Sequence, residues 1–186
     1  MNILIISVSH PLQLLEVETD SEPLRASKAR LRAMLEERFA TGTVAAIFEE
    51  CSFTKVSIAA QLAAERYPKV PWHNICMTVE ERKAAGIYEA LNDRPSHPDN
   101  NMEYTIEERI PADEIREDYF AEHILAAESA QGDILVLVGD MHVEPVARRL
   151  RAKGHTVEIR PELVPIKRWI NRTTVELQGA IDDQSS

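Results

Sequence analysis

Residues 134–138, Ile134-Leu135-Val136-Leu137-Val138, form the most apolar run of the chain, and Gly139-Asp140-Met141-His142 follows directly. A continuous apolar run of this length is typical of a strand that is buried on both faces, as in a parallel sheet covered by helices. Ile3 to Val8 repeats the pattern near the start of the chain. The two runs therefore predict two central parallel strands.

Outward from these runs, short apolar segments alternate with segments of helical spacing. Alternation of strands and helices implies a mostly parallel sheet with right-handed crossovers. The sequence predicts a single three-layer α/β domain over residues 1–181, with a frayed tail at 182–186. Strands are also expected at 44–48, 72–77 and 156–159, and helices at about 22–40, 56–67, 78–92, 111–127 and 144–153.

Residues 94–110 interrupt this alternation. Pro95, Pro98 and the run Asp99-Asn100-Asn101 argue against regular structure there. A loop of this length is unusual in a compact domain and is commonly a lid or a binding loop. We expect it to cover a site, and we expect one more helix around Trp169.

Composition and charge restrict the class of partner. The 186 residues are 44% hydrophobic, which is enough for a buried core, and no apolar run is long enough to cross a bilayer. Asp and Glu number 31 against 21 Lys and Arg, giving a net charge of −10. An acidic protein of this kind is a poor match for nucleic acid or for anionic membrane surfaces, because both are bound mainly by cations.

The cysteines and the first residues favour a cytoplasmic location. Cys51 and Cys76 form no CxxC pair, so zinc-ribbon and thioredoxin signatures are absent, and two reduced thiols are the simpler interpretation. The segment that begins Met1-Asn2-Ile3 has no basic region ahead of its short apolar run. It indicates a buried first strand and not a secretion signal.

Common catalytic and nucleotide-binding motifs are missing. The sequence contains no GxGxxG after the first strand, no GxxxxGK[ST], no HExxH and no GxSxG. Any chemistry must therefore be deduced from where polar side chains fall relative to the predicted strands.

Three predicted strands end in side chains that can handle protons or bind metals. In open parallel sheets, ligands bind beyond the carboxyl ends of the strands. These ends are Ser7-Val8-Ser9-His10, Glu49-Glu50-Cys51 and Gly139-Asp140-Met141-His142. Two imidazoles and a carboxylate can hold a metal with an open position for water, or can activate water without a metal.

Each of these residues also has a simpler interpretation. His10 precedes Pro11 and could be an ordinary exposed loop histidine. Glu49 and Glu50 could cap the next helix or lie in solvent, and His142 could bond to backbone at a helix start. The agreement of three strand ends favours a shared site.

Two arginines are candidates for binding an anion. Arg116 lies in the strongly acidic segment 113–118 directly after the long loop, and Arg82 follows two glutamates. A guanidinium group suits a carboxylate or phosphate ligand. The alternative is an ordinary ion pair within the helix, which contributes little when exposed. His73 and His123 are better explained as core or surface histidines, and Tyr119 as a packing residue.

A family resemblance rests on these same patches. Ser7-x-x-His10 and Gly139-x-x-His142 resemble the paired GxxH motifs of the TraB/ChaN/erythromycin-esterase-like superfamily, with Ser7 in place of the first glycine. Phe48-Glu49-Glu50 resembles its glutamate after the second strand, and residues 115–121 resemble its helix-opening arginine. The resemblance spans about residues 3–160 and is closest over 134–157.

The resemblance implies an α/β fold and a site more than a substrate. Some members of that superfamily look like metal-dependent proteases that use the GxxH histidines and the glutamate as ligands. Others open macrolide lactones with a histidine base and no metal, and others bind haem or shut down peptide signals.

Together these observations predict a hydrolase that acts on a small molecule or a peptide. The alternatives are a non-catalytic protein that binds a small molecule or haem, and an interaction module or homo-oligomer. Zn, Mn or Co is the favoured cofactor and haem is less favoured. The expected catalytic residues are His10, Glu49, Arg116 and His142; the substrate contacts are Ser7, Glu50, Arg82, Gly139 and Asp140; and the metal ligands are His10, Glu49, Glu50 and His142.

Overall fold

The computed structural model describes residues 1–51, 56–92, 110–127 and 131–160. Within these residues, five strands form one sheet in the order β3-β2-β4-β1-β5, and every neighbouring pair is parallel. This confirms the predicted α/β class with its parallel sheet. The strands are β1 (Asn2–Val8), β2 (Val44–Glu49), β3 (Trp72–Asn74), β4 (Asp133–Gly139) and β5 (Thr156–Arg160).

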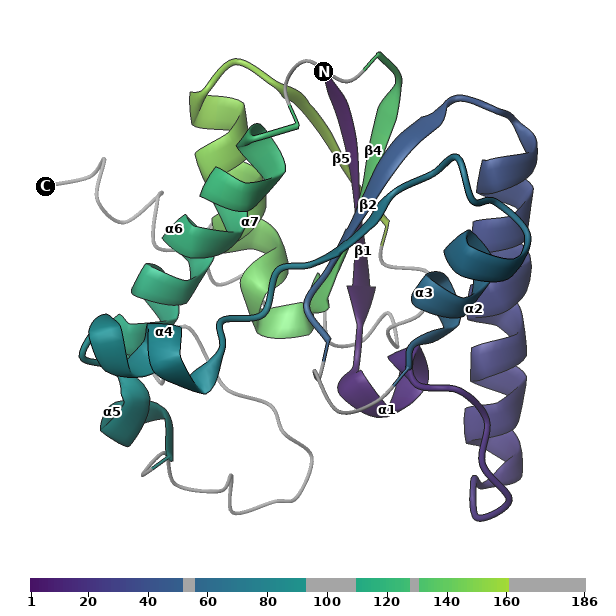
Figure 1. Ribbon diagram of the computed structural model, residues 1–186, viewed down its shortest axis with the longest axis horizontal. Helices are drawn as coiled ribbons and strands as arrows, with labels where there is room; N and C mark the ends of the chain where they lie inside the picture. The colour runs from purple at the N-terminus through teal and green to yellow at the C-terminus, as the bar shows by residue number, and fades with distance from the viewer. Residues whose placement is uncertain (52–55, 93–109, 128–130, 161–186) are drawn as a thin grey trace, which may run out of the picture.

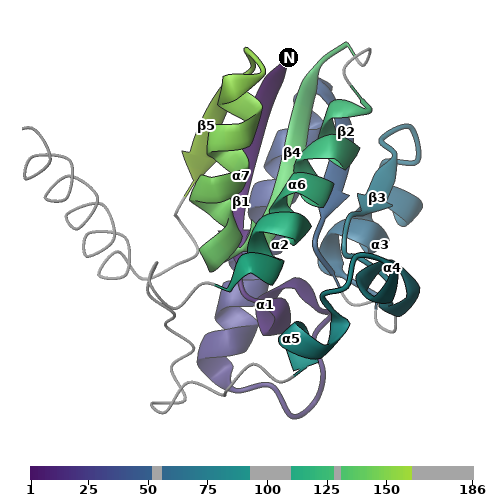
Figure 2. The same cartoon turned by 90° about the vertical axis from the view of Figure 1, so that its left-hand side faces the viewer.

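Helices cover both faces of the sheet (Figure 1), which confirms the three layers. α2 (Glu22–Ala40) and α3 (Ile58–Glu65) lie on one face, and α6 (Pro111–Leu125) and α7 (Asp140–Ala152) lie on the other. Figure 2, in which α6 and α7 face the viewer, places β5 and β3 at the two edges of the sheet.

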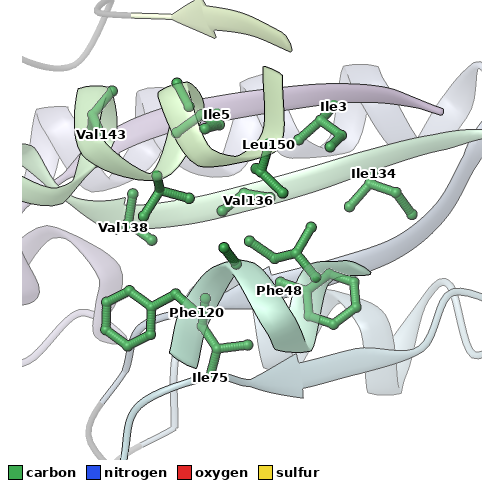
Figure 3. Packing of buried hydrophobic residues seen from close by; sticks show 14 of the residues in the cluster. Ile3, Ile5, Phe48, Ile75, Phe120, Ile134, Val136, Val138, Val143 and Leu150 are labelled. Carbon is green, nitrogen blue, oxygen red and sulfur yellow. The ribbon is translucent and has the colours of Figure 1, made fainter. Parts of the chain in front are cut away.

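The buried face of each strand follows the two-residue period of a pleated chain. In β4, Ile134, Val136 and Val138 pack toward α6 and α7, where Phe120 fills the layer (Figure 3). Leu135 and Leu137 belong to the cluster under α2 and α3. This explains why the sequence of β4 is apolar at every position: both faces of the strand are covered.

The ends of several helices differ from the sequence prediction. α7 begins at Asp140, four residues before the expected start, so that His142 lies in its first turn. The helix expected over 78–92 is two helices, α4 (Val79–Ala84) and α5 (Tyr88–Asn92), because Gly86 takes a positive φ of 69° between them. A short helix that the sequence analysis did not predict, α1 (His10–Gln13), follows β1.

The helices that follow β2 and β4 lie on opposite faces of the sheet. The chain passes from β2 to α3 on one face and from β4 to α7 on the other. Neighbouring strands that diverge in this way open a crevice at their carboxyl ends, where ligands of such sheets bind. In Figure 1, α1 and the start of α7 lie at this edge of the sheet.

Some predicted features lie outside the described residues. These are the loop at 94–109 with His97, the helix around Trp169 and the tail at 182–186. Among the helices that are described, none has the length and apolar character needed to cross a membrane.

Candidate functional site

Glu50 lies at the carboxyl ends of the neighbouring strands β2 and β4. It directly follows β2, and its side chain is buried. Oε1 accepts from Arg116 Nη2 at 2.5 Å and Oε2 accepts from the Gly139 N–H at 3.0 Å. The Glu50 N–H donates to the Leu137 carbonyl at 2.9 Å, which continues the β2–β4 pairing by one residue. Residues from β2, β4 and α6 therefore meet at this carboxylate.

Its neighbours keep this buried carboxylate acidic. Burial alone raises the pKa of Glu50, because it disfavours the charged form. The electrostatic effects of the neighbouring His142 and Arg116, with smaller contributions from His10 and the Gly139 N–H, outweigh that effect and hold the pKa below its ordinary value of 4.5. The direction of this shift favours an ionised Glu50 at neutral pH.

His142 lies between two carboxylates. Only 2% of the residue is exposed. Its Nδ1 is 2.9 Å from Glu117 Oε1, and its Nε2 is 3.8 Å from Glu50 Oε1. Its ring meets Phe120 edge to face, with the ring centroids 5.5 Å apart. The imidazole is therefore held by packing and by Glu117, and its second nitrogen faces Glu50 beyond hydrogen-bond distance.

Charged residues of α6 and α7 complete the set of side chains around Glu50 and His142. Arg116 also reaches Asp113 Oδ1 at 3.4 Å, and Arg149 Nη1 lies 3.3 Å from Glu117 Oε2. Both carboxylates are fully buried. These residues lie where the connections after β2 and β4 leave on opposite faces of the sheet, the topological switch point of the fold. We call the set the switch-point cluster: Glu50, Asp113, Arg116, Glu117, His142 and Arg149.

The sequence prediction missed Asp113, Glu117 and Arg149. A signal for the two acids is present, since Asp113, Glu117, Phe120 and Ile124 recur at the spacing of one helix face, and all four are buried. Polar residues at inward positions of such a stripe indicate a buried polar network. Asp113 also lies in the acidic first turn, where a carboxylate suits the helix dipole, and Glu117 belongs to the same acidic segment, so the signal is hidden.

Ser7, Gly139 and Asp140 line the same edge of the sheet. Ser7 is buried, and its Oγ donates to Asp140 Oδ1 at 3.3 Å, which links the ends of β1 and β4. A Cβ atom on Gly139 would lie 3.3 Å from Glu50 Oε2. That separation is tight, so the absence of a side chain at this position lets the Glu50 carboxylate approach the backbone.

His10 reaches the site indirectly. It opens α1 and is exposed, and its Nδ1 is 3.2 Å from Gln13 Oε1. Gln13 is buried and donates through Nε2 to the Glu50 carbonyl at 3.0 Å. Gln13 therefore connects His10, which follows β1, to Glu50, which follows β2. Gln13 was not among the residues predicted from the sequence.

Glu49 lies on the opposite face of the sheet from Glu50. Its Oε2 accepts from Ser57 Oγ at 2.5 Å and from Trp72 Nε1 at 2.7 Å, and its buried Oε1 has no hydrogen-bond partner among the described residues. Burial raises the pKa of Glu49 to about 7, against the lowering effect of these two donors. Glu49 and the switch-point cluster are therefore separate environments.

Arg82 and Tyr119 belong to the packing of α4. Arg82 Nε lies 3.4 Å from the Thr78 carbonyl in its own first turn. Tyr119 donates to Glu81 Oε1 at 2.7 Å and so connects α6 to α4. Burial, followed by the Glu81 carboxylate, raises the pKa of Tyr119 to about 12.

Two further findings concern metals and cavities. In the described part of the chain, no group of three or more His, Cys, Asp or Glu side chains is arranged to hold a metal ion. A hollow of about 180 Å³ lies at the opposite, amino-terminal edge of the sheet, next to Asn2, Arg38 and Asp133. That hollow does not adjoin the switch-point cluster.

In comparisons with protein-family models, with curated proteins and with solved structures, no match to this chain was found. The resemblance to the TraB/ChaN/erythromycin-esterase-like superfamily stays a prediction from short motifs.

Proposed function

We propose that this protein is a hydrolase in which His142 takes a proton from water beside Glu50 and Arg116. The main support is the position of His142, whose Nδ1 contacts Glu117 and whose Nε2 faces Glu50 beyond hydrogen-bond distance. The crevice is also where the topology of the sheet favours ligand binding. The substrate is a small molecule or a peptide, as the sequence predicts.

The carboxylates on each side of His142 suit a general base. A carboxylate on Nδ1 orients the imidazole and leaves Nε2 able to accept a proton. The imidazolium that forms then lies between the negative charges of Glu117 and Glu50, at 2.9 and 3.8 Å.

Arg116 supplies positive charge at the same place. Its side chain is 15% exposed and is oriented by Glu50 and Asp113. A guanidinium group held in this way is preorganised, so it can stabilise negative charge that develops on a carbonyl or phosphoryl oxygen. This is the role proposed for Arg116 in the reaction.

The metal-dependent version that the sequence predicts would need Glu50, His142 and His10 as ligands, but the described residues do not arrange three such side chains around one ion. Zn, Mn or Co bound there would activate the water directly. Metal analysis distinguishes the two versions. Bound metal that disappears in both His10→Ala and His142→Ala supports the metal version, and metal content that is the same in both variants rules it out.

The experiment that tests the proposal is a panel of chromogenic carboxylic esters, lactones, phosphoesters and peptides. The wild-type protein is compared with the double variant Glu50→Gln/His142→Gln, after circular dichroism has established that both are folded. We expect turnover of at least one class by the wild type and its loss in the variant. Equal turnover by the two proteins would contradict the proposal.

One observation favours a second candidate, a non-catalytic binding protein. Arg116 is already paired with two carboxylates, so its charge is compensated within the protein. Such a site could hold a neutral ligand without turning it over. A rise in melting temperature with a ligand that is not consumed would favour this candidate, and a Soret band in the purified protein would identify haem.

A further inference from the structure

We propose that Glu117 and Arg149 are positioning residues that fix His142 in the tautomer protonated at Nδ1 and thereby leave Nε2 as the proton acceptor. This inference rests on the proposed function for its consequence in catalysis. The tautomer itself is a property of the folded protein and can be measured without a substrate.

Glu117 presents one carboxylate oxygen to each partner. It is fully buried, with Oε1 2.9 Å from His142 Nδ1 and Oε2 3.3 Å from Arg149 Nη1. An ionised carboxylate only accepts hydrogen bonds. The neutral imidazole must therefore carry its proton on Nδ1 in order to bond with Glu117.

Arg149 is anchored independently of His142. Its Nε donates to Asp118 Oδ1, its Nη2 donates to the Glu114 carbonyl at 3.3 Å, and its Nη1 donates to the Pro145 carbonyl at 3.2 Å. These bonds hold the guanidinium across α6 and α7. It consequently has a fixed orientation toward Glu117, and its charge compensates that of the buried carboxylate.

Nε2 is left without a direct hydrogen bond to Glu50. The 3.8 Å between Nε2 and Glu50 Oε1 is too long for one. In this tautomer a lone pair on Nε2 lies on the Glu50 side of the ring, where the proposed reaction requires a proton acceptor. Without the Glu117–Arg149 pair, nothing in this contact set would favour that tautomer over the other.

Glu117→Gln gives a sharp test, because Arg149 controls which way the new amide points. A guanidinium group only donates, so it attracts the amide oxygen. The amide nitrogen then faces His142 and donates to Nδ1, which must lose its proton. We expect the proton to move to Nε2 in Glu117→Gln, and to return in part to Nδ1 in Glu117→Gln/Arg149→Met, where the amide is free to turn.

The measurement is ¹⁵N NMR of the histidine side chains. The buffer is made alkaline until the same spectrum shows that the His142 imidazole is neutral. The wild type should show His142 protonated at Nδ1, and the two variants should differ as described. Arg151→Met is the matched control, because Arg151 pairs with the exposed Glu144 on the same helix and should leave the tautomer unchanged.

Two results would overturn the inference. The first is a wild-type His142 protonated at Nε2, which needs no variant to fold. The second is the same tautomer in the wild type and in Glu117→Gln, which would make the pair a structural link between α6 and α7. Neither result depends on finding a substrate, so failure of this inference and failure of the proposed hydrolase can be told apart.

Discussion

Glu49 and Glu50 are consecutive residues at the end of β2, and their carboxylates lie on opposite faces of the sheet. Glu49 contacts Ser57 and Trp72 on the side of α3, whereas Glu50 contacts Arg116 of α6. Their pKa values shift in opposite directions as a result: that of Glu49 rises to about 7, and that of Glu50 falls below 4.5. Among the described residues, Glu50 has a cationic partner in Arg116 that compensates for its burial, and Glu49 has none.

The raised pKa of Glu49 predicts a loss of stability as the solution becomes alkaline. Folded Glu49 keeps its proton up to about pH 7, while in the unfolded chain it loses it near 4.5. The folded state therefore binds more protons in this range, and the free energy of unfolding falls as pH rises through it. A shift of this size corresponds to about 3 kcal/mol.

Urea unfolding at pH values from about 5 to about 8 checks this prediction. Glu49→Gln should remove this part of the pH dependence, because the amide does not titrate. Glu80→Gln, at an exposed position of α4, serves as the control and should follow the wild type. Parallel curves for wild type and Glu49→Gln would show that Glu49 is ionised in the folded protein throughout this range.

Removal of Arg116 should destabilise the protein strongly. Arg116→Met retains the apolar stem but leaves the buried Glu50 carboxylate without its guanidinium partner. Breaking a buried ion pair from one side typically costs about 3–5 kcal/mol. We expect Glu50→Gln/Arg116→Met to be less destabilised than the sum of the two single variants. Additive effects in this double-mutant cycle, measured by urea unfolding, would mean that the pair is not coupled.

Gly132 and Gly154 should differ in their tolerance of alanine. Both have positive φ angles, of 139° and 86°. A Cβ atom on Gly132 would lie 2.3 Å from the Thr43 carbonyl oxygen, whereas one on Gly154 meets nothing within 4 Å. Gly132→Ala should therefore lower the melting temperature clearly more than Gly154→Ala. Equal shifts in melting temperature would indicate that the backbone just before β4 can move away from Thr43 without loss of stability.

The long apolar strands made the fold predictable. In runs such as Ile134 to Val138 every side chain is apolar and suits either face of a sheet that is covered on both sides. Such a run can therefore be assigned as a strand without knowing its register. The helix boundaries were less predictable where local signals compete. α7 was expected from about residue 144, but it begins at Asp140 with Pro145 inside the helix, and its first turn carries His142.

The candidate site was predictable only at the level of strand ends. The sequence places Glu49 and Glu50 at one edge, but a shift of one residue exchanges the two faces, so the choice between them depends on the register. The pairing of Glu49 with Leu137 fixes that register. The contributions of Asp113 and Glu117 depend on the rotation of α6 about its axis, which the packing of Phe120 and Ile124 sets.

His123 provides a matched comparison for His142. It lies on α6 within the described chain, is exposed, and has Nδ1 2.8 Å from the Tyr119 carbonyl in the preceding turn. His123→Gln should therefore leave both the stability and any turnover close to those of the wild type. A large loss of activity in this variant would indicate that the active site lies near α4 and α5 and not at His142.

The most direct test of the account is the turnover number of His142→Gln, measured with whichever substrate class the wild type hydrolyses. General base catalysis contributes about 10²- to 10⁴-fold to a rate, so we expect a loss of that order in His142→Gln and none in His123→Gln. A His142→Gln variant that is folded and turns over substrate at the wild-type rate would contradict the assignment of His142 as the base.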